Sequence, residues 1–333
     1  MNTKVTAVTG ISGLVGGNLA RALLAQGYRV RGLIHHDRRA IQGLDVACFP
    51  GDIRDIDSLR QIFAGAEVVY HLAAHISLET SEGSQTQAVN VLGTRNVVNA
   101  CLECGVERLV HVSSIHTLDQ DLLGQQGSET HRRARLPRRL HYSRSKTAGE
   151  LEVRRGVEAG LDAVILKPTG IIGPYDFKPS YLGRAILALA HRKLPALVNG
   201  GFDWVDVRDV VAGMIHAQQE AKSGSSYVLS GHWRSVRDIA DQVELLTGVP
   251  APRMVVPLWM AYLGIPLMRF LAKIQKQEPL YTRMSLDALS SHQLVNGDLA
   301  QRELNIVPHP FEETIADTVD WFAANGYLQL PGN

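Results

Sequence analysis

Short apolar runs rich in β-branched residues alternate with amphipathic segments over the first 170 residues of the chain. The apolar runs predict strands at residues 4–9, 29–34, 46–49, 67–72, 108–113 and 163–167. The segments between them repeat apolar side chains at helical spacing and predict helices at residues 14–26, 56–64, 85–104 and 142–159. Strands that alternate with helices long enough for crossover connections predict a doubly wound parallel sheet of the α/β class.

The pattern becomes irregular after Gly173 and Pro174. Its apolar positions predict helices at residues 181–191 and 210–221, strands at 202–207 and 226–229, and a mainly helical remainder. We therefore expect a large α/β domain formed by residues 1–172 and 202–231. A smaller, mainly helical substrate-binding domain, formed by residues 173–201 and 232–333, would cover the carboxyl ends of the strands, where open α/β sheets bind ligands.

A glycine-rich turn joins the first predicted strand to the first predicted helix. Glycines at this place let the chain turn tightly, and they let backbone N–H groups and the helix N-terminus approach a pyrophosphate. Tight strand-helix turns also need glycine for steric reasons alone. The strand before and the helix after the turn favour a Rossmann-type dinucleotide site, with contacts from Gly10, Ser12, Gly13, Leu14, Val15 and Gly16.

The end of the second predicted strand is basic. Sites for NAD usually place a carboxylate there to bind the ribose hydroxyls, but this chain has Ile34. The residues around it include Arg31, His35, Arg38 and Arg39. This corner favours NADP(H), whose additional phosphate binds cationic side chains. NAD(H) stays open, because a small change of register would bring the carboxylate of Asp37 to the ribose.

Two further strand ends offer cofactor contacts. Asp52 and Ile53 follow the third strand, and the carboxylate of Asp52 could accept a hydrogen bond from the adenine amino group. The fourth strand ends in Leu72, Ala73 and Ala74, whose small alanine side chains would let the backbone approach the cofactor. An ordinary loop aspartate and tight packing explain these residues equally well.

A tyrosine and a lysine four residues apart open the helix predicted at residues 142–159. This spacing places the phenol of Tyr142 and the ammonium of Lys146 on one helix face. We expect the ammonium to lower the tyrosine pKa, so that the phenol exchanges protons with an alcohol or a carbonyl near neutral pH. Ser114 follows the fifth strand and adds a hydroxyl at the same edge of the sheet.

Together these motifs resemble the extended short-chain dehydrogenases/reductases of the NAD-dependent epimerase/dehydratase superfamily. The resemblance implies that Tyr142 is the general acid/base, that Ser114 binds the substrate oxygen, and that Lys146 binds the nicotinamide ribose and lowers the tyrosine pKa. It also implies that hydride passes between the nicotinamide and the substrate carbon. The motifs are Thr9-Gly10-x-x-Gly13-x-x-Gly16, Gly51-Asp52, His71 to Ala74, Asn90-x-x-Gly93, Ser113-Ser114, Tyr142-x-x-x-Lys146 and Lys167 to Pro174, where Pro168, Thr169 and Ile171 would flank the nicotinamide.

Departures from the family pattern separate three reactions. Ile115 and His116 stand where 4,6-dehydratases have an Asp-Glu pair, and Gly170 stands where sugar-nucleotide epimerases commonly have asparagine. The chain therefore resembles dihydroflavonol-reductase-like and 3β-hydroxysteroid-dehydrogenase-like members, which act on ketones or secondary alcohols. A nucleotide-sugar epimerase is the alternative. A non-catalytic dinucleotide sensor is disfavoured, because such relatives typically lack the Tyr-Lys pair.

Three segments add expectations about the substrate. His75 and His116 follow strand ends near the expected nicotinamide and are tentative substrate contacts. The arginine-rich segment from Arg132 to Arg139 is either a solvated loop or a receptor for a phosphate-bearing substrate group. The apolar stretch at residues 254–268 is too short to span a membrane. We expect it to form a wall of an apolar substrate pocket, with a peripheral membrane contact as the alternative.

Composition excludes several other classes. A net charge of +1 and 45% hydrophobic residues indicate an ordinary globular chain and give no sign of nucleic-acid binding. The amino terminus leads directly into a strand without a signal-peptide pattern, so we expect a cytoplasmic protein. Cys101 and Cys104 lie in a helical pattern, where packing explains them better than metal or redox chemistry, and no metal is expected. The helices at 85–104 and 142–159 resemble the pair that forms dimers in this family, so a homodimer is plausible.

Overall fold

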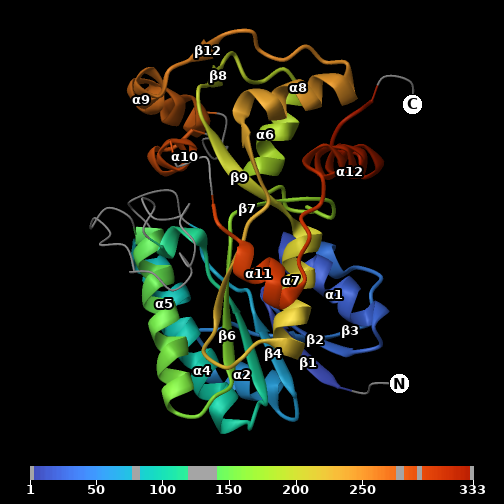
Figure 1. Ribbon diagram of the computed structural model, residues 1–333, viewed down its shortest axis with the longest axis vertical. Coiled ribbons are helices and arrows are strands. Elements are labelled where there is room, and N and C mark those ends of the chain that lie inside the picture. Colours follow the sequence, from blue (N-terminus) through green and yellow to red (C-terminus); the bar gives the residue numbers. More distant parts are fainter. Residues whose placement is uncertain (1–3, 77–82, 119–140, 275–280, 291–294, 331–333) are drawn as a thin grey trace.

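The computed structural model describes residues 4–76, 83–118, 141–274, 281–290 and 295–330. Within these ranges a seven-stranded sheet forms the lower half of the molecule as drawn in Figure 1. Every neighbouring pair of its strands is parallel. The strand order is β10 (Ser226–Leu229), β6 (Ala163–Pro168), β5 (Arg108–Val112), β4 (Val68–His71), β1 (Val5–Thr9), β2 (Arg29–Ile34) and β3 (Val46–Pro50).

Helices cover both faces of this sheet, which explains why its central strands are apolar without alternation. One face packs against α2 (Ile56–Phe63), α4 (Thr94–Glu103) and α5 (His141–Glu158). The other face packs against α1 (Leu14–Ala25), α7 (Val207–Glu220) and α11 (Asp298–Leu304). Side chains on both faces of β4, β5 and β6 are buried in these two cores. The predicted doubly wound parallel sheet is therefore confirmed.

The helix predicted at residues 85–104 is continuous but changes its winding. It begins as α3 (Gly83–Gln87), continues as a π-helical segment η3 (Ala88–Gly93) and ends as α4. The side-chain amide of Asn90, inside the π segment, donates to the carbonyl oxygen of His75 at 3.0 Å and to Ser145 Oγ at 2.9 Å. Wide turns of this kind are frequent at functional sites, and this one fixes the loop after β4 against α5.

A second group of elements lies above the sheet edge, in the upper half of Figure 1. A small sheet contains β11 (His232–Ser235), β9 (Gly201–Asp206) and β7 (Gly170–Ile172), and β12 (Val255–Val256) pairs with β8 (Leu197–Val198). β9, expected in the large domain, thus pairs outside the large sheet. The helices here are α6 (Tyr181–Ala190), α8 (Val236–Thr247), α9 (Leu258–Ile274), α10 (Arg283–Leu289) and α12 (Phe311–Ala324).

None of the helices in the described ranges is both long enough and apolar enough to cross a lipid bilayer.

One buried carboxylate ties the two groups of elements together. Asp206 ends β9 and caps α7, and it accepts hydrogen bonds from the Arg208 backbone N–H at 2.7 Å, from the Arg208 guanidinium and from Thr314 Oγ1 of α12 at 2.7 Å. Burial alone would raise the pKa of Asp206, but the hydrogen bonds from Arg208 and Thr314 outweigh it and hold the pKa below its usual value. The folded protein therefore favours the ionised carboxylate.

Replacing Asp206 with alanine is expected to lower the free energy of unfolding by about 2–4 kcal/mol, because it removes a helix cap and several hydrogen bonds to a charged group. A lowered carboxyl pKa stabilises the fold above the pKa of the unfolded chain, and this contribution disappears as the pH falls. The difference between wild type and Asp206→Ala, measured by urea unfolding, should therefore shrink below pH 4. The exposed pair of Arg237 and Asp241 on α8 supplies the control: Asp241→Asn should change stability by less than about 0.5 kcal/mol. Equal effects of both variants would contradict the assignment.

Candidate functional site

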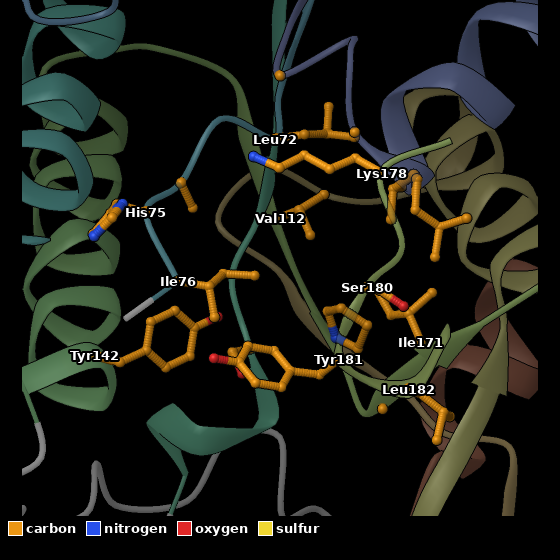
Figure 2. A pocket seen from close by; sticks show the side chains of 18 of the residues that line it. Leu72, His75, Ile76, Val112, Tyr142, Ile171, Lys178, Ser180, Tyr181 and Leu182 are labelled. Carbon is orange, nitrogen blue, oxygen red and sulfur yellow. The ribbon is translucent and has the colours of Figure 1, made fainter. Parts of the chain in front are cut away.

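A deep cleft opens where the strands of the large sheet end. Its volume is about 940 Å³, and its walls come from the loops after β1 to β6 and from the elements above them. All parallel strands end at the same edge of a sheet, so residues far apart in sequence meet here. Figure 2 shows Tyr142 and Tyr181 entering this cleft from opposite sides, one from α5 and one from α6.

The glycine turn between β1 and α1 forms one end of the cleft. Gly10 has φ of +75°, and a Cβ atom there would lie 2.6 Å from the backbone nitrogen of Ala73. A Cβ at Gly16 would lie 2.3 Å from the carbonyl oxygen of Gly10. Only glycine fits at these two positions, because the first turn of α1, the turn itself and the end of β4 are in backbone contact. The cradle that results has the form that a dinucleotide pyrophosphate requires.

Most of the predicted cofactor residues line this one cleft. Besides Gly10 and Gly16, they are Ser12, Gly13, Leu14, Val15, His35, Asp52, Ile53, Leu72, Ala73, Ala74, Tyr142, Lys146, Pro168, Thr169 and Ile171. The sheet therefore brings together the turn, the second and third strand ends and the expected nicotinamide end, and these residues fit a dinucleotide. Asp52 is bound by Arg54 at 2.6 Å, and the hydrogen bond from Arg54 holds the pKa of Asp52 below its usual range.

Two predicted cofactor residues do not belong to this arrangement. In the described part of the chain, the cleft walls include neither Arg31 nor Arg38. The guanidinium of Arg31 turns away and donates to the carbonyl oxygens of Ile62 at 3.1 Å and Ala64 at 2.6 Å. Since β2 alternates its side chains between two faces, a residue three positions before the strand end points to the side of the sheet that α2 covers. The structure gives no support to Arg31 or Arg38 as cofactor contacts.

The basic corner is instead formed by residues that the sequence pattern did not single out. His36 and Lys178 line the cleft beside His35. Lys178 reaches across the cleft in Figure 2, and its charge contributes to lowering the pKa of Asp37. The carboxylate of Asp37 is bound by the guanidinium of Arg39 at 2.6 Å, the hydrogen bond that chiefly lowers its pKa to about 2. In the sequence, only the position of Lys178 shortly after Gly173 and Pro174 could have indicated its role.

The three predicted catalytic residues meet in the same cleft. Tyr142 and Lys146 lie on α5, Ser114 follows β5, and the side chains of Tyr142 and Ser114 share a hydrogen bond. The ammonium of Lys146 donates to the carbonyl oxygen of Val112 at 2.7 Å. Ser114 also caps the short helix η4 (Ile115–Thr117) by accepting from the His116 N–H. The four-residue spacing thus places the phenol and the ammonium on one helix face, with the phenol beside the Ser114 hydroxyl.

Burial sets the pKa values of Lys146 and Tyr142. It lowers the pKa of Lys146 to about 8, an effect that the nearby carboxylate of Glu150 opposes. It raises the pKa of Tyr142, while the hydrogen bond with Ser114 acts in the opposite direction. The expectation that Lys146 would lower the Tyr142 pKa is therefore corrected for this structure, because desolvation of the phenolate is the larger effect.

Both tentative substrate residues also line the cleft. The ring of His116 stacks on Phe202 with centroids 5.9 Å apart and approaches the edge of Tyr142 at 6.4 Å. Burial lowers the pKa of His116 to about 4, so this imidazole is neutral at physiological pH. The backbone N–H of His75 donates to Asn90 at 2.7 Å, which fixes the loop after β4.

Apolar side chains dominate the part of the cleft that the second group of elements forms. They come from α6, β9, α8 and α10 and their connections: Leu182, Ala185, Leu189, Leu194, Phe202, Trp204, Val236, Ile239, Ala288 and Leu289. In the described part of the chain this wall carries no arginine or lysine side chain. This part of the cleft is therefore suited to an apolar group rather than to a diphosphate.

The apolar segment at residues 254–268 does not form this wall, contrary to expectation. None of its residues whose side chains the structure describes lines the cleft. Trp259 and Leu263 of α9 are 64% and 73% exposed, and Tyr262 binds Asp287 of α10 at 2.6 Å. The segment packs behind α10, which itself lines the cleft. A peripheral membrane contact stays a prediction, and the arginine-rich segment Arg132 to Arg139 lies outside the described residues.

The sheet, the glycine cradle and the cleft define a dinucleotide-binding α/β enzyme. Residues 6–230 match the NAD dependent epimerase/dehydratase family, and the chain belongs to this family. It is an NAD(P)-dependent oxidoreductase of the extended short-chain dehydrogenase/reductase type. It is 36% identical to sterol demethylase protein B of Methylococcus capsulatus over 97% of this chain and 99% of that protein. A ketoreductase of a farnesyl-dihydroquinoline oxide from Stigmatella aurantiaca is 29% identical over 90% of each chain.

A further relative from Synechocystis, provisionally named a dihydroflavonol 4-reductase, is 33% identical over 97% of this chain and 95% of its own length. Among solved structures, gox2253 superposes with a TM-score of 0.81 at 31% identity, covering 98% of this chain and all of that one. The UDP-glucose 4-epimerase of Thermotoga maritima has a TM-score of 0.79 at 17% identity, covering 96% of this chain and 99% of its own. At that identity the likeness shows the fold alone.

Gly16→Ala is expected to weaken NADPH and NADH binding by at least about tenfold, because the new Cβ would displace the Gly10 carbonyl and open the cradle. The matched control is Gly264→Ala on α9, where a Cβ would meet no described atom within 4 Å. Fluorescence titration of both variants measures the affinities, and thermal melting separates a local effect from unfolding. Wild-type affinity in a folded Gly16→Ala protein would show that the cradle does not bind the cofactor.

Proposed function

We propose that this enzyme transfers hydride between a nicotinamide cofactor and a ketone or secondary alcohol of a bulky apolar molecule. The observation that carries the proposal is the position of Tyr142 and Ser114, which lie where the glycine-lined part of the cleft meets its apolar wall. A carbonyl group at this junction would contact both hydroxyls. The remainder of its molecule would lie against apolar side chains.

The roles of the side chains follow from this placement. A bound nicotinamide supplies or accepts the hydride at the substrate carbon. In the reducing direction the phenol of Tyr142 donates a proton to the carbonyl oxygen, and Ser114 donates a hydrogen bond to the same oxygen. The raised pKa of Tyr142 keeps the phenol protonated and ready to donate. In the oxidising direction the phenolate form would accept the alcohol proton.

Lys146 would contribute both to cofactor binding and to proton transfer. Its ammonium lies between the Val112 carbonyl and the cleft, where it would bind ribose hydroxyls of the cofactor. A positive charge beside the phenol also favours the phenolate when the proton leaves. Because burial brings the pKa of Lys146 to about 8, this charge is present at neutral pH and is lost as the pH rises through that value.

NADP(H) is the cofactor that we favour, with NAD(H) as the alternative. His35, His36 and Lys178 supply basic groups at the end of β2, the place where the additional phosphate of NADP would lie. Asp37 also lines this corner and would favour NAD, but Arg39 already neutralises its carboxylate. The choice of cofactor would therefore depend on basic side chains other than Arg31 and Arg38, the two arginines that the sequence pattern had suggested.

Tyr142→Phe is expected to reduce turnover by about 10²–10⁴-fold, because it removes the proton donor and leaves the ring in place. The dissociation constant for NADPH should change by less than about threefold. Tyr262→Phe is the control, since it removes a phenol hydroxyl that binds Asp287 outside the cleft. Stopped-flow measurement of NADPH oxidation with a ketone substrate gives the rates. Unchanged turnover in Tyr142→Phe would refute the role of the phenol.

Calorimetric titration distinguishes the proposed reaction from its alternatives. Wild-type protein should bind NADPH more tightly than NADH and should oxidise NADPH in the presence of apolar cyclic ketones. Tight NAD(H) retention, binding of nucleotide sugars and no net cofactor oxidation would instead identify an epimerase. Cofactor binding without turnover on either panel would favour a dinucleotide sensor.

A further inference from the structure

A buried acid lies behind the catalytic residues on the same helix face. Tyr142, Lys146 and Glu150 follow one another at four-residue spacing on α5, so their side chains share one side of the helix. The side chain of Glu150 is 1% exposed, and it faces away from solvent toward β5 and β6. Nothing in the hydride transfer described above uses this carboxylate, which makes its burial a feature in need of a reason.

The two carboxylate oxygens of Glu150 contact two different strand ends. One oxygen accepts hydrogen bonds from Ser113 Oγ at 2.5 Å and Thr117 Oγ1 at 2.8 Å. These two residues enclose Ser114, one directly before it and one at the end of η4. The other oxygen lies 3.3 Å from the ammonium of Lys167, the residue before Pro168 on β6, whose side chain is 3% exposed.

We propose that Glu150 is a positioning residue whose single carboxylate joins the three segments that carry Ser114, the Tyr142 and Lys146 pair, and the Pro168–Thr169 wall of the cleft. Buried ion pairs contribute little to stability when well-packed apolar residues could replace them. Such residues could fill the space of Glu150 and Lys167, but they could not orient two hydroxyls on either side of Ser114. Catalysis needs the reacting groups aligned to a fraction of an ångström, and this network supplies the alignment.

The charge of Glu150 has a second effect, on Lys146. Two titratable groups on other elements interact with Lys146, namely His71 on β4 and His111 on β5, and Lys167 on β6 interacts with His111. Burial lowers the pKa of both histidines, that of His71 to about 3 and that of His111 well below its usual value, which favours their neutral forms. Glu150 is the acid that opposes the lowering of the Lys146 pKa by burial. Removing it would let that pKa fall further below 8.

The inference rests on the proposed function for its kinetic test, and its binding test is independent of substrate. Glu150→Gln alone removes the carboxylate that lies beside the buried ammonium of Lys167, so the informative protein is the double variant Glu150→Gln/Lys167→Met. We expect it to fold, to lose up to about 100-fold in kcat/KM for the ketone, and to show the high-pH decrease of NADPH affinity at a lower pH than wild type. The sign follows from Lys146, whose ammonium form would be lost at lower pH once its pKa falls.

Glu152→Gln is the matched control, because it removes a carboxylate of α5 that binds only Arg95 and Arg155 among the described contacts. It should keep the wild-type rate and the wild-type pH dependence of NADPH affinity. A folded double variant with unchanged kcat/KM and an unchanged affinity profile from pH 6 to pH 10 would overturn the proposal. If wild type binds NADPH but reduces no ketone, the proposed reaction fails, and the shift of the affinity profile still decides the role of Glu150.

Discussion

Parallel strand pairing is the constraint from which the site follows. All strands of the large sheet run in the same direction, so their carboxyl ends lie on one side of the sheet. Every strand-to-helix turn therefore opens on that side. Backbone contact between Gly10 and the end of β4 shows how closely these turns approach one another. Residues separated by more than 100 positions in the chain, such as Gly13 and Tyr142, therefore line a single cleft.

Desolvation determines the protonation of the site residues, because the burial that shapes the cleft also disfavours charged groups within it. It moves the pKa of Tyr142 upward and that of Lys146 downward, so both side chains tend toward neutrality. Helix spacing alone indicates the attraction between phenolate and ammonium. It does not reveal how much water each group loses on burial. A charged lysine in such a place needs a counter-charge nearby, and Glu150 is the acid that the described structure provides.

The sequence predicted the sheet and most of the site because both depend on local patterns. Apolar runs predicted the six strands as far as β6 nearly to the residue, and the short motifs at their ends predicted which side chains would meet. The structure places Arg31 and the described side chains of the segment at 254–268 outside the cleft walls, and the reason is different. The direction of a side chain at a strand end, and which of two stacked helices faces the cleft, depend on packing between elements distant in sequence. The same dependence hid Lys178, which reaches the cofactor corner from a loop after β7.

On the proposed function, the two halves of the cleft have different tasks in recognition. An apolar wall binds in proportion to the area that it buries, and it discriminates poorly between molecules of similar size. Orientation must therefore come from the few polar groups at the junction, where Ser114, Tyr142 and the neutral imidazole of His116 lie close together. A substrate that places its carbonyl among these groups satisfies them, and one that enters reversed leaves them buried without a partner. The cost of those unmet hydrogen bonds, rather than the fit of the apolar body, would decide which carbon atom receives the hydride.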